Sequence, residues 1–153
     1  MSQDSIQNIE VFSELELPEE LPPILSQLGR YEVETEEEDA EGGAEISAFD
    51  PESDRLFVVN ALTNSIDILD LSNLSEPTLI SSIDLNEIAA GVNSVAVNEG
   101  IVAVALANDP EQDPGAVAFF DTEGALLNRI TGLGALPDML TFTPDGTKVI
   151  VAN

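Results

Sequence analysis

The sequence predicts an all-β fold, a β-propeller built of four-stranded blades, and three observations support this. Ala48–Asn60 aligns without a gap with Thr141–Asn153, and a looser copy between them ends at Asn108. The asparagines that end the three copies are 48 and 45 residues apart, which is the period of one propeller blade. Short apolar runs alternate with turn residues over 44–153, as in antiparallel sheets. A β-sandwich is the alternative fold, because ten short strands can also form two packed sheets.

The first 43 residues differ in composition from the rest of the chain. Residues 1–27 are expected to form a flexible leader with at most one helical turn, since Pro18, Pro22 and Pro23 prevent a long helix. Residues 28–43 are expected to hold one strand, at 28–33, followed by an acidic loop. The acidic run over 32–41 repels itself, so a solvated loop is favoured over the recruitment of calcium or of a basic partner.

The remaining residues divide into two complete units and half of a third. We expect blades at 44–91 and 92–135 and half a blade at 136–153. Tight turns are expected at Gly100 and Gly124, where glycine supplies a positive φ. The expected strands are 44–49, 55–60, 65–70 and 78–84 in the first unit, 93–98, 101–107, 116–121 and 125–131 in the second, and 138–143 and 148–153 in the third.

Side-chain alternation within these strands predicts how they pack. Ile66 and Ile68 are expected to face packing layers, whereas Asp67 and Asp70 are expected to reach solvent or turn amides. The Ala- and Val-rich strand 101–107 suits an inner position, where neighbouring blades crowd the axis.

About two and a half blades do not close a ring, since propellers have about four to eight. An open end exposes a strand edge that invites aggregation. We therefore expect the chain to be the front part of a longer protein with a seven-bladed ring, and the remaining blades of that protein to be its partners. Strand 28–33 is then expected to join the last blade and close the ring.

Composition and charge exclude several functions. The 30 acidic and 4 basic residues give a net charge of −26, which disfavours nucleic acid and anionic membrane surfaces as partners. The chain has no cysteine and no histidine, so disulfides, thiolate metal sites and a Ser-His-Asp triad cannot form from these residues. No apolar run is long enough for a transmembrane helix, and membrane insertion is not expected.

Several segments, taken in order, resemble the choice-of-anchor I family. The resemblance covers about 28–153 and rests on Leu28–Tyr31, Gly43–Asp50, Arg55–Asn60, Asn93–Val97, Asp113–Gly115 and Gly134–Gly146. Ile68–Ser72 with Pro77–Ile80 also resembles the LVIVD repeat of surface propellers, which are related to WD40- and YVTN-type repeats. The resemblance implies a surface or secreted bacterial propeller, similar to mesenchyme-specific cell-surface glycoprotein. Some relatives are described as alkaline phosphatases, and the family carries over no catalytic residue.

The resemblance and the charge together suggest where the protein acts. We expect an extracellular or cell-surface location, reached without an N-terminal signal peptide, because Met1–Asp4 lacks a basic start and no apolar stretch follows. The cytoplasm is the alternative location.

Two groups of residues are candidate sites. Asn60, Asn108 and Asn153 share one position after a strand, where an asparagine either bonds local backbone or lines a ligand rim. Asp109, Glu111 and Asp113 alternate in one loop and are the candidate calcium ligands, although the loop departs from the EF-hand pattern. A solvated loop is the expected reading, and calcium the less favoured one.

Two functions remain after these exclusions. The first is a non-catalytic interaction module that binds a protein or a glycan through its loops. The second is the N-terminal part of a calcium-dependent phosphatase or phytase-like phosphoesterase, whose catalytic groups lie outside these residues. No turnover is expected from the 153 residues by themselves.

Overall fold

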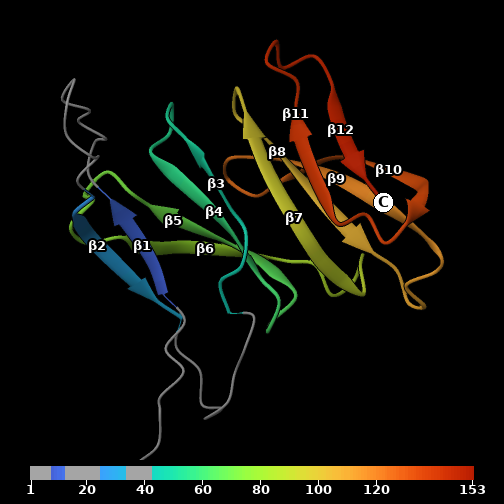
Figure 1. Ribbon diagram of the computed structural model, residues 1–153, viewed down its shortest axis with the longest axis horizontal. Helices are drawn as coiled ribbons and strands as arrows, with labels where there is room; N and C mark the ends of the chain where they lie inside the picture. The colour runs from blue at the N-terminus through green and yellow to red at the C-terminus, as the bar shows by residue number, and fades with distance from the viewer. Residues whose placement is uncertain (1–7, 13–24, 34–42) are drawn as a thin grey trace, which may run out of the picture.

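The described residues of the computed structural model, 8–12, 25–33 and 43–153, form twelve β-strands and no helix (Figure 1). No helix in this part of the chain is therefore long and apolar enough to cross a membrane. The strands are β1 (Asn8–Phe12), β2 (Gln27–Glu32), β3 (Ser47–Asp50), β4 (Arg55–Asn60), β5 (Ser65–Asp70), β6 (Thr78–Asp84), β7 (Gly91–Asn98), β8 (Ile101–Ala107), β9 (Pro114–Asp121), β10 (Leu126–Ala135), β11 (Met139–Phe142) and β12 (Val149–Ala152).

These strands form four antiparallel sheets, each built from strands consecutive in the sequence. Two sheets have four strands, β3–β4–β5–β6 and β7–β8–β9–β10, and two have two strands, β1–β2 and β11–β12. The sheets lie side by side in chain order, with β1–β2 at one end and β11–β12 at the other (Figure 1). The first strand of a sheet contacts the first strand of the next, β3 with β7 and β7 with β11. Those strands therefore form the inner side, as in successive blades of a propeller.

The largest apolar cluster lies between the two four-stranded sheets. It forms because alternate residues of a strand point to opposite faces, so a run of apolar residues supplies both faces. In β5, Ile66 and Ile68 join this cluster, and in β8 so do Val102 and Val104. Its buried members are Phe57, Val59, Ile66, Ile68, Ile83, Leu85, Val92, Val95, Val102, Val104, Leu106, Ala116, Ala118 and Phe120.

Smaller clusters hold the two end sheets in place. The intervening residues of β8, Ala103 and Ala105, pack with Val117 against Leu140 of β11. On the far face of the first four-stranded sheet, Tyr31 of β2 packs against a cluster formed by Leu56, Val58, Leu69 and Leu71. Each sheet is therefore stabilised by apolar contact with its sequence neighbours, which is the arrangement of a repeat protein.

Most predicted elements are present with the same or nearly the same bounds. The strands 55–60, 65–70, 78–84 and 101–107 are confirmed to the residue, and Gly100 and Gly124 have positive φ values of 75° and 89°. The β-sandwich alternative is wrong, because four sheets stack in series instead of two packing face to face.

Three expectations need correction or stay open. The leader was expected to hold no strand, but residues 8–12 form β1 and pair with β2. Strand β8 is the second strand of its sheet, so it is a central strand and not the innermost one. Residues 1–7, 13–24 and 34–42, which include most of the leader and of the acidic run, lie outside the described residues. That strand 28–33 belongs to a last blade, and that the ring has seven blades, remain predictions.

Candidate functional site

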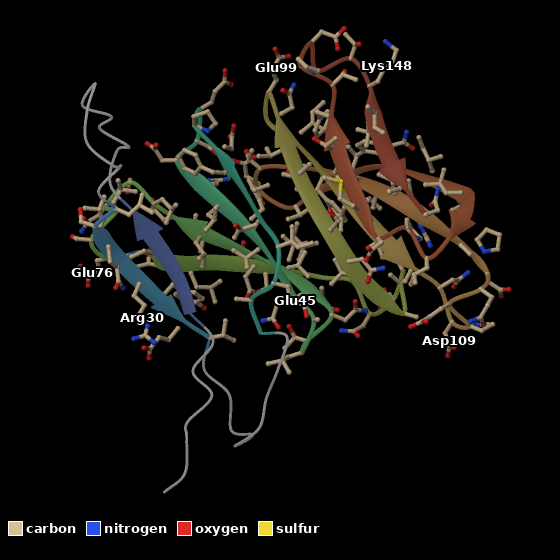
Figure 2. The ribbon with its side chains drawn as sticks, in the orientation of Figure 1. Arg30, Glu45, Glu76, Glu99, Asp109 and Lys148 are labelled. Atoms are coloured by element: carbon tan, nitrogen blue, oxygen red, sulfur yellow. The ribbon has the colours of Figure 1, made fainter. Side chains whose placement is uncertain are left out.

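The connections between strands gather on two opposite faces of the stack. The turns β3–β4, β7–β8 and β11–β12 lie at the top of Figure 1, and Glu99 and Lys148 mark this upper face in Figure 2. Asp109 lies toward the opposite end, which we call the lower face (Figure 2). The lower face comprises the connections 61–64, 85–90, 108–113 and 136–138.

Aspartates close the upper-face turns by accepting hydrogen bonds within them. Asp121 Oδ1 accepts the amides of Glu123 and Ala125, at 3.0 and 2.8 Å. Asp145 Oδ1 accepts the Thr143 hydroxyl at 2.5 Å and the Thr147 amide at 3.2 Å. These bonds, the Thr143 hydroxyl first, lower the pKa of the Asp145 carboxyl below its ordinary value of 3.8. These bonds leave both carboxylates engaged with their own turns.

Asp70 behaves in the same way in the β5–β6 connection. Its Oδ1 accepts the Ser72 amide at 2.8 Å. That bond, with a smaller contribution from Arg55, lowers the pKa of the Asp70 carboxyl. Asp50 is buried at the start of the β3–β4 turn, where its Oδ2 accepts the Ser53 hydroxyl at 2.5 Å.

Arg55 joins the two four-stranded sheets at the upper face. Its Nη1 donates to the Thr122 carbonyl at 2.5 Å and to Glu123 Oε1 at 2.9 Å. The Arg55 side chain is mostly covered, whereas Glu123 is exposed. The guanidinium therefore fixes the β9–β10 turn against the start of β4, and sequence reasoning did not assign it this role.

A buried polar network lies on the far face of the first four-stranded sheet, the face that also carries Tyr31. Asp67 is 5% exposed, and its Oδ2 accepts Asn60 Nδ2 at 2.9 Å. Its Oδ1 accepts the Ser82 hydroxyl at 2.6 Å. The expectation that Asp67 reaches solvent or a turn amide is therefore wrong, because the carboxylate bridges β4, β5 and β6 across one face.

The three repeat asparagines lie at the lower ends of equivalent strands but differ in their environments. Asn60 is buried, and its Oδ1 accepts the Thr63 amide at 3.3 Å. Asn108 is exposed and donates to the Pro114 carbonyl at 3.4 Å. Asn153 is exposed and lies against Gly134. The predicted backbone-bonding role is confirmed for Asn60 and Asn108, and Asn60 is not available to line a ligand rim.

Two further polar side chains position β11 against β7. Asn93 Nδ2 donates to the Pro137 carbonyl at 3.0 Å, and the buried Ser94 hydroxyl accepts the Leu140 amide at 3.2 Å. Asn93 and Ser94 are consecutive in the sequence, and their partners lie 44 and 46 residues further along. No local pattern could have revealed them.

The candidate calcium ligands lie in the exposed loop between β8 and β9. Asp109, Glu111 and Asp113 are all exposed, and the Asp113 amide donates to the Pro110 carbonyl at 2.9 Å. Within the described residues, no three acidic side chains come close enough together to hold a metal ion. That Asp109, Glu111 and Asp113 hold calcium stays a prediction, and no chemistry is derived through an ion.

The lower face nevertheless has a definite chemical character. Its four connections contain five acidic residues, Glu87, Asp109, Glu111, Asp113 and Asp138, and no lysine or arginine. Leu62 and Leu136 are partly exposed on the same connections. Acidic side chains beside apolar ones suit recognition of a basic, partly apolar surface.

Comparison with known proteins supports this description of the fold. The model of a family described as the choice-of-anchor I domain matches residues 45–153. A search of curated proteins found no match.

Two solved structures resemble the stacked sheets. The chain is similar to hydrazine synthase of Kuenenia stuttgartiensis, with a TM-score of 0.62, 19% identity, and coverage of 82% of this chain and 32% of that one. It is also similar to a luciferin-regenerating enzyme, with a TM-score of 0.57, 16% identity, and coverage of 83% of this chain and 42% of that one. The chain thus spans about a third to two fifths of the length of these structures, and at these identities the likeness shows the fold alone.

Proposed function

Since the chain belongs to the choice-of-anchor I domain family, a family of surface-associated domains, we propose that it is a non-catalytic interaction module. It binds a protein partner or a glycan through the connections of the lower face. The location is extracellular or at the cell surface.

One contrast between the two faces supports this proposal. The upper-face aspartates are engaged by their own turns, at Asp70, Asp121 and Asp145. The lower-face loop 108–113 is exposed at every residue. Loops that a rigid sheet displays but does not need for packing are where binding residues concentrate. The lower face therefore has the side chains with the freedom to meet a partner.

The charge of the lower face indicates which partner it favours. Five acidic residues without a base attract lysine- and arginine-bearing surfaces and repel polyanions. A protein with a basic surface is accordingly favoured over a neutral or acidic glycan. The association rate is expected to fall as the ionic strength rises, because exposed charges more than about 10 Å apart are screened at 0.1 M salt.

A binding experiment with matched variants tests the proposal. The wild-type protein is passed over a glycan array and over immobilised cell-surface proteins, and its affinity for any ligand found is measured at two salt concentrations. The triple variant Asp109→Asn, Glu111→Gln, Asp113→Asn is expected to lose at least tenfold in affinity. The control Glu52→Gln, Glu99→Gln, Asp145→Asn removes three charges from the upper face and is expected to bind normally.

Two results would contradict the proposal. Equal binding by both triple variants removes the lower face as the site. Hydrolysis of phosphomonoesters or phytate by the protein, lost on chelation and restored by calcium, supports the phosphoesterase alternative instead.

A further inference from the structure

The connection between β5 and β6 carries a sequence motif that the proposed function does not use. Asn73-Leu74-Ser75 is an Asn-X-Ser sequence in which X is not proline, which is the acceptor sequence for N-linked glycans. None of the other asparagines up to Asn128 is followed two positions later by a serine or a threonine. Because so short a motif also occurs by chance, the geometry around Asn73 decides whether it can serve as an acceptor.

The connection displays the acceptor side chain on a rigid support. Residues 72–76 are all exposed, so Asn73 is not needed for packing. Directly before them, Leu71 is buried in the apolar cluster that Tyr31 covers, which anchors the start of the connection. Figure 2 shows Glu76 of the same connection at the periphery of the molecule. A bulky group attached at Asn73 therefore extends into solvent without displacing a packed residue.

The Ser75 side chain holds the carboxamide of Asn73 in place. Asn73 Oδ1 accepts the Ser75 hydroxyl at 2.8 Å and the Ser75 amide at 3.3 Å. The Glu76 amide donates to the backbone carbonyl of Asn73 at 3.0 Å and closes the turn. An asparagine that bonds the backbone two residues further on forms an Asx turn. The two residues that define the motif are thus in direct contact through their side chains.

This contact leaves free the atom that an N-linked modification uses. Both bonds to the Asn73 side chain engage its oxygen, and within the described residues Nδ2 makes no hydrogen bond. The Ser75 hydroxyl also draws electron density toward Oδ1, which makes the protons on Nδ2 more acidic. Loss of one of these protons must accompany any new bond at Nδ2.

We propose that Asn73 is a site of N-linked glycosylation. The N-glycosidic bond forms between Nδ2 and C1 of an oligosaccharide, and the bond between C1 and the phosphate oxygen of a lipid-pyrophosphate donor breaks. One Nδ2 proton is lost as the pyrophosphate leaves, so atoms and charge balance. The proposal rests on the location proposed above, because an Asn-X-Ser acceptor is a surface loop of a secreted protein.

The position of Asn73 predicts what the glycan does. Strand β5 runs from the connection 61–64 on the lower face to the connection that holds Asn73, so the glycan lies at the opposite end from loop 108–113. It leaves the proposed binding face open. Next to it begins β6, the last strand of its sheet, where Leu79 and Ile80 are each 47% exposed. A bulky hydrophilic group there hinders other chains from pairing with this strand edge.

Mass spectrometry of the full-length protein from its native cells tests the proposal. Cleavage after acidic residues releases Leu71–Glu76, and the added mass of a glycan is expected on its asparagine. Asn73→Gln and Ser75→Ala, expressed in the same cells, are expected to lose this mass. Ser75→Thr keeps the hydroxyl and is expected to retain it. Asn128→Gln is the matched control, because Asn128 is an exposed asparagine outside any Asn-X-Ser or Asn-X-Thr sequence.

Two results would overturn the proposal. The first is an unmodified Asn73 in the native protein. If that protein is recovered from the medium or the cell surface, the proposed location stands and the glycan alone is wrong, whereas recovery from the cytoplasm alone contradicts both. The second is a glycan that persists at Asn73 in Ser75→Ala, which shows that the motif does not direct the modification. Circular dichroism of each variant confirms that folded proteins are compared.

Discussion

Replacing Asp67 by alanine is expected to destabilise the first four-stranded sheet by about 2–4 kcal/mol. The substitution removes two acceptor atoms at once, Oδ2 for Asn60 and Oδ1 for Ser82. Asn60 is 4% exposed, so its amide cannot turn to water, and a buried donor left unpaired costs about 1–3 kcal/mol. Ser82 is exposed and recovers a water partner, so its lost bond to a charged acceptor contributes about 1 kcal/mol.

Urea unfolding followed by far-ultraviolet circular dichroism measures this loss. Asp67→Asn keeps an acceptor oxygen and the side-chain volume, and it is expected to cost roughly half as much as Asp67→Ala. In a double-mutant cycle, Asn60→Ala with Asp67→Ala is expected to be less destabilising than the sum of the single variants, by about 1–2 kcal/mol. A loss below about 0.5 kcal/mol for Asp67→Ala, or additive effects in the cycle, would refute the assignment of a buried, mutually dependent network.

Three further predictions follow from the same geometry. Gly29→Ala places a Cβ against the Leu74 carbonyl, so the β1–β2 sheet is expected to detach from the first four-stranded sheet. The fluorescence of Tyr31, the only tyrosine in a chain without tryptophan, measures this detachment, and unchanged fluorescence would contradict the contact. Glu123→Ala is expected to cost less than about 1 kcal/mol because the Glu123 carboxylate is exposed. Arg55→Ala is expected to cost about 1–3 kcal/mol in urea unfolding because the Thr122 carbonyl loses a charged donor. Because the pKa of Asp145 is depressed in the folded chain, its ionised carboxylate stabilises the fold above pH 3.8, and this stabilisation is lost as the pH falls through the depressed pKa. The difference in unfolding free energy between wild type and Asp145→Asn is therefore expected to be constant at neutral pH and to shrink below about pH 4. A difference that grows on acidification would contradict this assignment.

The sequence predicted the repeat architecture well because the information is local. A β-branched run followed by a turn residue fixes both strand type and strand end, and the strand Ser65–Asp70 illustrates how closely the bounds follow. Strand β1 was missed because scattered prolines make residues 1–27 read as a leader, whereas β1 exists through its pairing with β2. Such pairing depends on sequence-distant partners and leaves no local period.

The same reasoning explains why the polar contacts were harder to predict than the strands. Side-chain alternation correctly placed Asp67 on the face of β5 opposite to Ile66 and Ile68. It could not show that this second face is also buried. The roles of Arg55 and Ser94 require knowing which turn or strand of the next sheet lies beside them, 67 and 46 residues away. The acidic character of the lower face, in contrast, follows directly from composition once the connections are located.

The series of apolar clusters between successive sheets has a consequence for how the molecule opens. Each sheet contacts only its sequence neighbours, so its stability depends on one or two interfaces between sheets and not on a single core common to all four. Within the described residues the sheet β11–β12 packs on one neighbouring sheet, and in the 153-residue chain its amide hydrogens should exchange with deuterium long before those of β5 and β8, which lie between two packed layers. Opening of the β11–β12 sheet is thus expected to require loss of its contact with the second four-stranded sheet, through Leu140, without disturbing the cluster between the two four-stranded sheets.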